Sequence, residues 1–242
     1  MRSRITTPLP DQSVERFLRY LRVERNASEY TCQNYLADLE RFFNHLGHRR
    51  LRDISPFDIR RFVASLSASG DAKRSTARRL ACLRSFFRFL CREGTLRQNP
   101  AAAIPTPRLE KRLPSFLDEQ QVVKLLGTPP VVKWQGLRDR AILETLYSTG
   151  MRVSELVGLN LQDIDEVTGT VVVRGKGKKE RLCPIGDTAL KSIRAYLARR
   201  PKKHLQIPYA VFVSQKLSRL TVRQVDRLLV RYVKLAGLPA SI

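Results

Sequence analysis

The stretch GMRVSEL at residues 150–156, followed by TVVVRGKGKKERLCPI at residues 170–185, decides the fold of this chain. Gly150 is typical of a helix end, and the apolar residues just after it recur at helical spacing. The pattern then changes period. β-Branched residues fill 170–174, a glycine–lysine turn occupies 175–179, and a return strand follows at 181–185. A short helix followed by a β-hairpin is therefore predicted.

Helical patterns lie on both sides of this hairpin in the sequence. They predict helices at about 118–126, 136–149, 187–199 and 221–236. Val211-Phe212-Val213 predicts a short strand or turn, and Asp163-Ile164-Asp165 predicts a turn before the hairpin. The second half of the chain is thus expected to be mostly helical, with a small hairpin sheet.

The first hundred residues predict four helices whose apolar stripes are wide enough to face a common core. Ser28 is placed to cap the second helix, and Ser55 followed by Pro56 is placed to open the third. The glycines that end the second, third and fourth helices are Gly47, Gly70 and Gly94.

Four prolines fall within residues 95–114 and disfavour helix there. We therefore expect a helical domain at residues 8–94, a semi-rigid linker at 95–114 and a second domain at 115–242. The predicted fold class is mainly α: a two-domain clamp that joins an N-terminal helical bundle to an α-rich domain with a small β-hairpin sheet.

Charge is the outlying feature of the composition. The chain has 45 Lys+Arg against 22 Asp+Glu, a formal net charge of +23. Residues 1–112 hold 23 basic and 11 acidic side chains, and residues 113–242 hold 22 and 11. An excess shared by two folded domains indicates an extended polyanion as partner, and double-stranded DNA is the first expectation. A membrane surface is a weaker alternative, because no apolar stretch approaches the length of a spanning helix.

Basic residues gather at two places that are candidates for DNA contact. A stripe at i, i+4, i+8 runs along the fourth helix, further arginines crowd its start, and the hairpin turn carries lysines. A merely solvated face is the alternative reading of each cluster. The residues are Arg74, Arg78, Arg79, Arg84, Arg88 and Arg92 on the helix, and Lys176, Lys178, Lys179 and Arg181 on the hairpin.

Other kinds of site are disfavoured by residue type and spacing. The hairpin lysine does not form a nucleotide-binding phosphate loop, because a strand follows the turn and Gly177 stands where Ser or Thr is needed. Four cysteines and three histidines lie at no metal-ligand spacing. We expect no metal, no other cofactor and no bound nucleotide, and reduced thiols typical of a cytoplasmic protein.

Arg152 is the strongest single candidate for chemistry. It stands at a helix start among apolar neighbours, so its guanidinium needs an anion close by. Two partners fit the sequence, a phosphate or the nearby Glu155.

The paired motifs at 150–156 and 175–181 resemble those of the tyrosine recombinases, most closely the bacterial Xer type. The pattern Ser28-x-x-Thr31-x-x-x-Tyr35-x-x-Asp38-Leu39 is similar to the family's core-binding domain. The stretches 92–100 and 113–117 are similar to its end and to the entry of the catalytic domain. The resemblance covers nearly the whole chain.

The resemblance implies site-specific DNA recombination without a metal. A tyrosine attacks the scissile phosphate, giving a 3′-phosphotyrosyl link and a free 5′-hydroxyl, and the intact enzyme works as a tetramer on two duplexes. Arg152 matches the first catalytic arginine and Lys176 the hairpin lysine that protonates the leaving oxygen. Cationic donors and a proton donor are what this chemistry requires.

The sequence departs from the family pattern at its end. The family continues with His-x-x-Arg, a further His or Trp, and the nucleophilic tyrosine, whereas this sequence stops at Ile242. We therefore expect a truncated gene product, a fragment or an incomplete sequence record, and we expect residues 1–242 not to cleave DNA.

Two alternatives stay open, a non-catalytic sequence-specific DNA-binding protein and a helix-turn-helix regulator. The target site, the partner recombinase and the choice between chromosome dimer resolution and element mobility also stay open.

Overall fold

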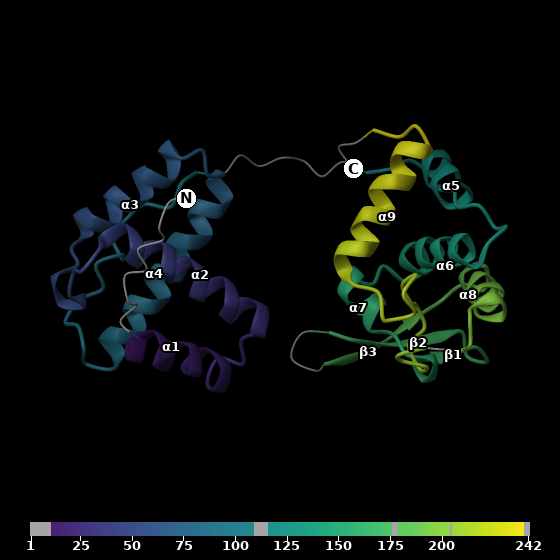
Figure 1. Ribbon diagram of the computed structural model, residues 1–242, viewed down its shortest axis with the longest axis horizontal. Coiled ribbons are helices and arrows are strands. Elements are labelled where there is room, and N and C mark those ends of the chain that lie inside the picture. The colour runs from purple at the N-terminus through teal and green to yellow at the C-terminus, as the bar shows by residue number, and fades with distance from the viewer. Residues whose placement is uncertain (1–10, 109–115, 176–178, 204, 240–242) are drawn as a thin grey trace. The chain divides into compact units, whose positions relative to one another are not determined.

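The chain divides into two compact units, Met1–Arg112 and Leu113–Ile242 (Figure 1). The computed structural model describes residues 11–108, 116–175, 179–203 and 205–239. Each unit has a hydrophobic core of its own, so each is described separately.

Four α-helices build the described part of the first unit, as the sequence predicts. Ser28 caps α2 through its hydroxyl, and Gly47 ends that helix at φ 68°. Ser55 and Asp58 form a capping box at the start of α3. A 3₁₀ turn, η1, which the sequence patterns do not predict, connects α2 to α3. The elements are α1 Asp11–Val23, α2 Glu29–Leu46, η1 Leu51–Asp53, α3 Pro56–Ala68 and α4 Lys73–Arg92.

Aromatic rings dominate the core of this unit. Phe42 meets Phe62 and Phe87 edge-to-face, at centroid distances of 5.1 and 6.0 Å. Phe17 packs against Phe86 from α1, 5.4 Å between centroids. All five rings are buried, and each contributes roughly 1.5–3 kcal/mol of burial free energy. Because α4 contacts α1, α2 and α3, its outer face is the part left for other contacts.

The first half of the predicted linker belongs to the first unit and is not an extended connector. Ala101 and Ile104 are buried in its core. Asn99 donates from its side chain to the backbone oxygen of Arg84 at 3.0 Å. Pro100 and the following Pro105 disfavour helix here, but they do not prevent burial, and this is where the prediction of an extended segment is wrong.

Among its described residues, the second unit places five α-helices and a small sheet around one core. The short helix, the hairpin strands and the flanking helices all form where the sequence predicts them. The elements are α5 Glu119–Gly127, α6 Trp134–Thr149, α7 Val153–Gly158, η2 Leu161–Asp163, β1 Ile164–Asp165, β2 Thr170–Arg174, β3 Glu180–Pro184, α8 Asp187–Arg199 and α9 Val222–Leu235.

The sheet has three antiparallel strands in the order β1-β2-β3. In the hairpin, Val173 pairs with Arg181 and Arg174 with Glu180. The segment 163–165, predicted as a turn, instead forms the end of η2 and the strand β1, with Ile164 paired to Val171.

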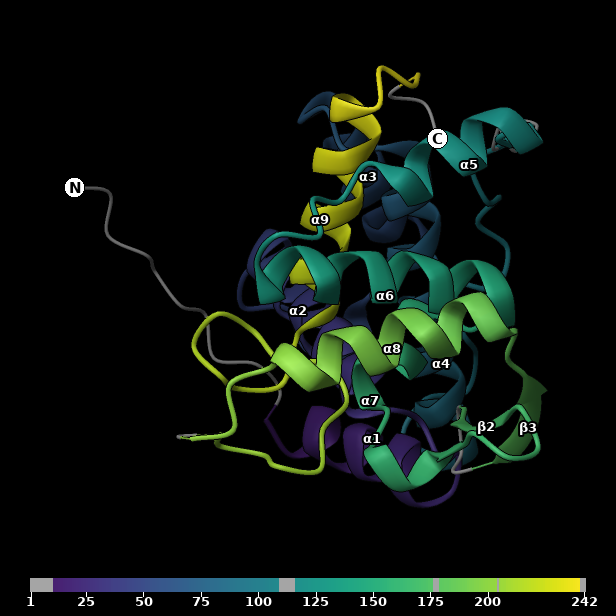
Figure 2. The same ribbon diagram turned by 90° about the vertical axis from the view of Figure 1, so that its right-hand side faces the viewer.

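Helices α6 and α8 lie side by side across the unit (Figure 2). The segment 210–213 is buried beside them, and the Tyr196 hydroxyl accepts a hydrogen bond from the Val213 amide at 3.3 Å. Helix α9 is tied to α6 by the buried Asp139, which accepts from the Tyr232 hydroxyl at 2.9 Å and from Arg231 at 3.0 Å. Helix α7 contacts both α9 and the hairpin strand β2, so these elements belong to the same packed unit.

Candidate active site

The two sequence motifs meet at one carboxylate. Glu155 lies in the first turn of α7, and its Oε1 accepts from Arg152 Nη1 at 3.0 Å and from Arg181 Nη1 at 2.9 Å. Its Oε2 accepts from the Arg152 backbone N–H at 2.8 Å and from Arg181 Nη2 at 2.8 Å. A Cβ placed on Gly175 would lie 3.5 Å from Oε1. The start of α7 therefore touches the base of the hairpin.

The electrostatics of this group are set by the two guanidiniums. The Glu155 side chain is only 4% exposed. Hydrogen bonds from Arg181, together with those from Arg152, lower its pKa to about 2 against the opposing effect of burial. The same pairing raises the pKa of Arg181. The carboxylate is thus ionised at neutral pH and carries one negative charge between two positive ones.

Arg152 makes the internal ion pair and still faces solvent. Its side chain is 74% exposed, and only Nη1 is engaged with Glu155. The two readings of the sequence are therefore compatible, because among the described residues Nε and Nη2 have no hydrogen-bond partner and can bind an anion.

The hairpin turn is bracketed by described residues on both sides. The Gly175 amide donates to the Lys179 carbonyl oxygen at 2.8 Å, and the Lys179 side chain is exposed. Lys176 and Lys178, which the sequence singles out as catalytic and DNA-binding candidates, lie outside the described residues.

The predicted arginine stripe on α4 requires a correction at Arg84. Its guanidinium turns inward onto the first unit, with Nε donating to the Ala101 carbonyl at 3.3 Å and Nη1 to Thr106 Oγ1 at 2.8 Å. Nη2 donates to the Ile104 carbonyl. Each of its three nitrogens donates to an oxygen of the first unit, so Arg84 holds the segment 101–106 against the helix.

Two further arginines at the start of α4 are engaged by acidic residues. Arg79 is only 13% exposed and lies 3.2 Å from Asp71, so it stabilises the bundle. Arg78 pairs with Asp38 through two hydrogen bonds but stays 43% exposed.

Arg92, at the end of the same helix, pairs with Glu24 at 2.7 Å, and its guanidinium carbon lies 4.5 Å from the centre of the Tyr20 ring. Helical spacing alone does not predict the ion pairs of Arg78 and Arg92, because each partner lies outside α4 and is distant in the sequence.

One face of α4 remains open. Arg74 and Arg88 are exposed, and neither makes an ion pair with any residue that the structure describes. Arg74, Arg78, Ala81, Ser85 and Arg88 follow one another at helical spacing along this face. Small side chains in the middle and cations at both ends suit close approach to a phosphate backbone.

Helix α9 carries a basic face that the sequence analysis missed. Arg223, Arg227 and Lys234 are exposed and stand at i, i+4 and i+11. Thr221 and Gln224 form a capping box at its start, a signal readable from the sequence. Arg223 and Arg227 make no ion pair within the described part of the chain.

Neither a metal centre nor a membrane span is found among the described residues. No three side chains of His, Cys, Asp or Glu gather there into a group that could hold a metal ion. No helix within those ranges has the length and apolar character to cross a bilayer. The four cysteines are free thiols.

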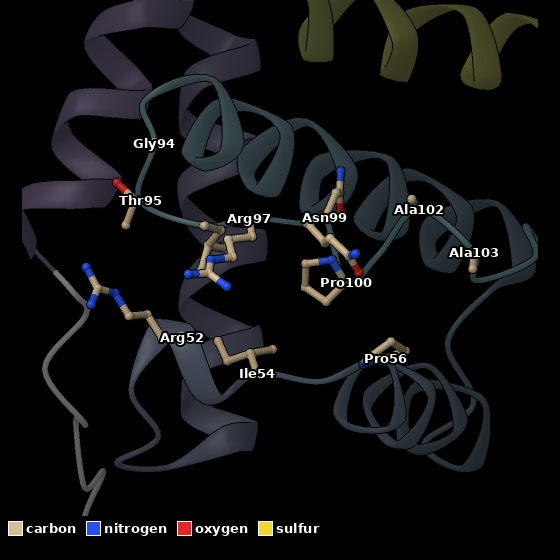
Figure 3. A pocket seen from close by; sticks show the side chains of 12 residues that line it. Arg52, Ile54, Pro56, Gly94, Thr95, Arg97, Asn99, Pro100, Ala102 and Ala103 are labelled. Atoms are coloured by element: carbon tan, nitrogen blue, oxygen red, sulfur yellow. The ribbon is translucent and has the colours of Figure 1, made fainter.

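A hollow of about 1000 Å³ lies in the first unit. It is bounded by the start of α3 and the segment 94–103, with the side chains of Arg52, Arg97 and Pro100 at its wall (Figure 3). None of the motif residues of the second unit lines it.

Two family models match the chain. Residues 14–94 match the phage integrase N-terminal SAM-like domain, and residues 115–241 match the phage integrase family. The tyrosine recombinase XerC of Syntrophus aciditrophicus is 38% identical over 96% of this chain and 80% of its own length. XerC of Pelotomaculum thermopropionicum is 40% identical over 95% of this chain and 79% of its own length.

Solved structures with low sequence identity share the fold. The XerH site-specific recombinase bound to its palindromic difH substrate has a TM-score of 0.75 at 18% identity, over 98% of this chain and 82% of that one. A lambda integrase dimer bound to a COC′ core site has a TM-score of 0.70 at 21% identity, over 95% and 82%. The chain belongs to the phage integrase family, the tyrosine recombinases of site-specific DNA recombination.

Proposed function

We propose that this chain binds duplex DNA through basic faces on both units, and that Arg152 contacts the phosphate at which strands are exchanged. The observation that carries the proposal is the exposed Arg152 guanidinium, held at the start of α7 by a buried carboxylate. A fixed cationic donor with free N–H groups is what a phosphate in reaction needs.

The chemistry follows the family. A tyrosine oxygen attacks phosphorus, the bond to the 5′-oxygen breaks, and the departing oxygen takes up a proton. Arg152 stabilises the charge that builds on the non-bridging oxygens. Lys176, which follows Gly175 in the sequence, supplies the proton. Support for both roles comes from Arg181 on β3, because its pair with Glu155 joins the hairpin to the start of α7.

In this proposal each unit brings a DNA-binding face of its own, the open face of α4 in the first unit and the basic face of α9 in the second. Both helices present exposed arginines without internal partners among the described residues. The two halves of the chain hold nearly equal excess charge, so each unit contributes phosphate contacts. Solved relatives are dimers and tetramers on DNA. By that likeness this chain acts with further protomers on two duplexes, in the cytoplasm where chromosomal DNA lies.

Salt dependence of DNA binding tests the contact residues. Replacing Arg152 or Arg88 with glutamine should each lower the slope of log K against log salt by about one unit. Arg22→Gln serves as the matched control, because Arg22 on α1 is already paired with Glu29 at 3.0 Å. An unchanged slope for both variants, with the control behaving alike, would remove these residues from the DNA interface.

We further propose that the polypeptide of residues 1–242 does not cleave DNA by itself. Tyr196 and Tyr232 are buried, their hydroxyls are hydrogen bonded, and burial raises the pKa of each. Tyr147 and Tyr209 are exposed. Within the described residues, neither hydroxyl makes a hydrogen bond to the Arg152–Glu155–Arg181 group.

A denaturing gel after incubation with a nicked duplex tests this second proposal. Residues 1–242 should bind the duplex without forming a covalent adduct. A fusion that adds a family segment with His-x-x-Arg and the tyrosine should form it, and Arg152→Ala should then suppress it by a few orders of magnitude. An adduct from residues 1–242 alone would refute the proposal, and Tyr147→Phe and Tyr209→Phe would identify its source.

A further inference from the structure

Arg181 occupies both oxygens of the carboxylate that holds Arg152. Its two terminal nitrogens lie 2.9 and 2.8 Å from Glu155 Oε1 and Oε2, a parallel two-point pair. Arg152 reaches the same carboxylate with only one side-chain nitrogen. Glu155 therefore accepts two side-chain hydrogen bonds from Arg181 of the hairpin and one from Arg152.

We propose that Arg181 is a positioning residue for Arg152, an inference that rests on the proposed function of Arg152 as a phosphate contact. Arg181 takes up the acceptor capacity of Glu155, so that the carboxylate anchors Arg152 at one point and leaves the rest of its guanidinium to the phosphate. Without Arg181, Glu155 binds Arg152 through two hydrogen bonds and competes with the phosphate for it.

The arrangement depends on a guanidinium at position 181. A lysine ammonium is a point charge and cannot fill both oxygens in parallel. Arg181 also stands on β3, paired across the hairpin with Val173, and its Nη1 lies 3.7 Å from a Cβ placed on Gly175. The same side chain thus sets the charge around Arg152 and joins the hairpin base to α7.

This inference gives Arg181 a different role from the one expected from the sequence. Arg181 is expected from the sequence to contact DNA, but its side chain is 42% exposed and its two terminal nitrogens are both engaged with Glu155. Its effect on phosphate binding is therefore exerted through Glu155 and Arg152, and a second substitution can separate the two routes.

The test measures the salt slope of duplex binding for the full chain and four variants. Arg152→Gln sets the loss that belongs to one phosphate contact, about one unit of slope. Arg181→Met should show a similar loss although Arg152 is intact. Adding Glu155→Gln to Arg181→Met should restore the slope, because a neutral amide no longer competes for Arg152. Arg181→Lys, which keeps the charge, should fall between the wild type and Arg181→Met and serves where Arg181→Met folds poorly.

Each outcome decides the matter. If Arg152→Gln lowers the slope and Arg181→Met or Arg181→Lys does not, Arg181 has no positioning role and the proposed function stands. If the double variant stays as weak as Arg181→Met, Arg181 either contacts DNA itself or only supports the fold, and the inference is overturned. If Arg152→Gln leaves the slope unchanged, the proposed function and this inference fall together.

Discussion

Arg84 and Arg88 stand one helical turn apart on α4 and should respond oppositely to the same substitution. Arg84 donates to three oxygens of the segment 101–106, whereas Arg88 is exposed and has no ion pair with the described residues. We expect Arg84→Gln to destabilise the first unit and Arg88→Gln to leave its stability unchanged while weakening DNA binding.

The size of the first effect can be worked from the contacts of Arg84. A hydrogen bond from a charged donor contributes about 1.5–3 kcal/mol when it is well buried, and about 1 kcal/mol suits a half-buried guanidinium whose partners regain some water. Losing three such contacts should cost about 3 kcal/mol. For a unit of roughly 100 residues, this lowers the melting temperature by more than about 10 °C.

Hydrogen exchange of the intact chain measures the stability of the first unit amide by amide, without interference from unfolding of the second unit. Amides of α4 and of residues 101–104 should lose protection in Arg84→Gln, by a factor of about 100 for 3 kcal/mol, and keep it in Arg88→Gln. The salt slope of duplex binding should fall by about one unit in Arg88→Gln. Equal protection in the two variants, together with equal losses of slope, would show that Arg84 belongs to the phosphate-binding stripe after all.

Three further outcomes can be checked by simpler measurements. Because the pKa of Glu155 is lowered to about 2 from an ordinary value of 4.5, its ionised form stabilises the fold above pH 4.5 and this contribution is lost as the pH falls toward 2. Urea titrations should therefore show a cost of Glu155→Gln that is full near neutral pH and gone near pH 2. Gly136→Ala should lower the stability of the second unit by about 1–3 kcal/mol in thermal unfolding, since its Cβ would lie 1.7 Å from the Pro130 carbonyl oxygen. Iodoacetamide should label the half-buried Cys91 of the native protein before Cys82, whose thiol is buried with its pKa raised by burial.

Elements with local signals could be predicted from the sequence. The caps at Ser28 and Ser55 and the hairpin at 170–184 each depend on residues close together in the chain, and the structure confirms them. Burial of Ala101 and Ile104 depends on a surface offered by α4. The sequence of residues 95–114 gives no sign of that surface on α4, so the prolines alone predict an extended segment.

The candidate site shows the same division. The spacing of 152 and 155 at a helix start made their ion pair predictable, because i, i+3 residues share a helix face. Arg181 joins the same carboxylate from a strand 26 positions away. Its contribution required the register of the hairpin against α7, which follows from the packing of the whole unit.

The composition allows internal ion pairs and phosphate binding at the same time, because basic side chains greatly outnumber acidic ones. With 45 basic and 22 acidic side chains, pairing every carboxylate once would still leave about half of the cations without a partner. The structure shares carboxylates further, since Glu155, Asp38 and Asp139 each hold two arginines. Such sharing stabilises the fold with few acidic residues. Each of these buried carboxylates, together with its two arginines, forms a group with a net positive charge. A phosphate approaching Arg152 therefore meets a site whose internal anion is already more than neutralised by the protein's own arginines.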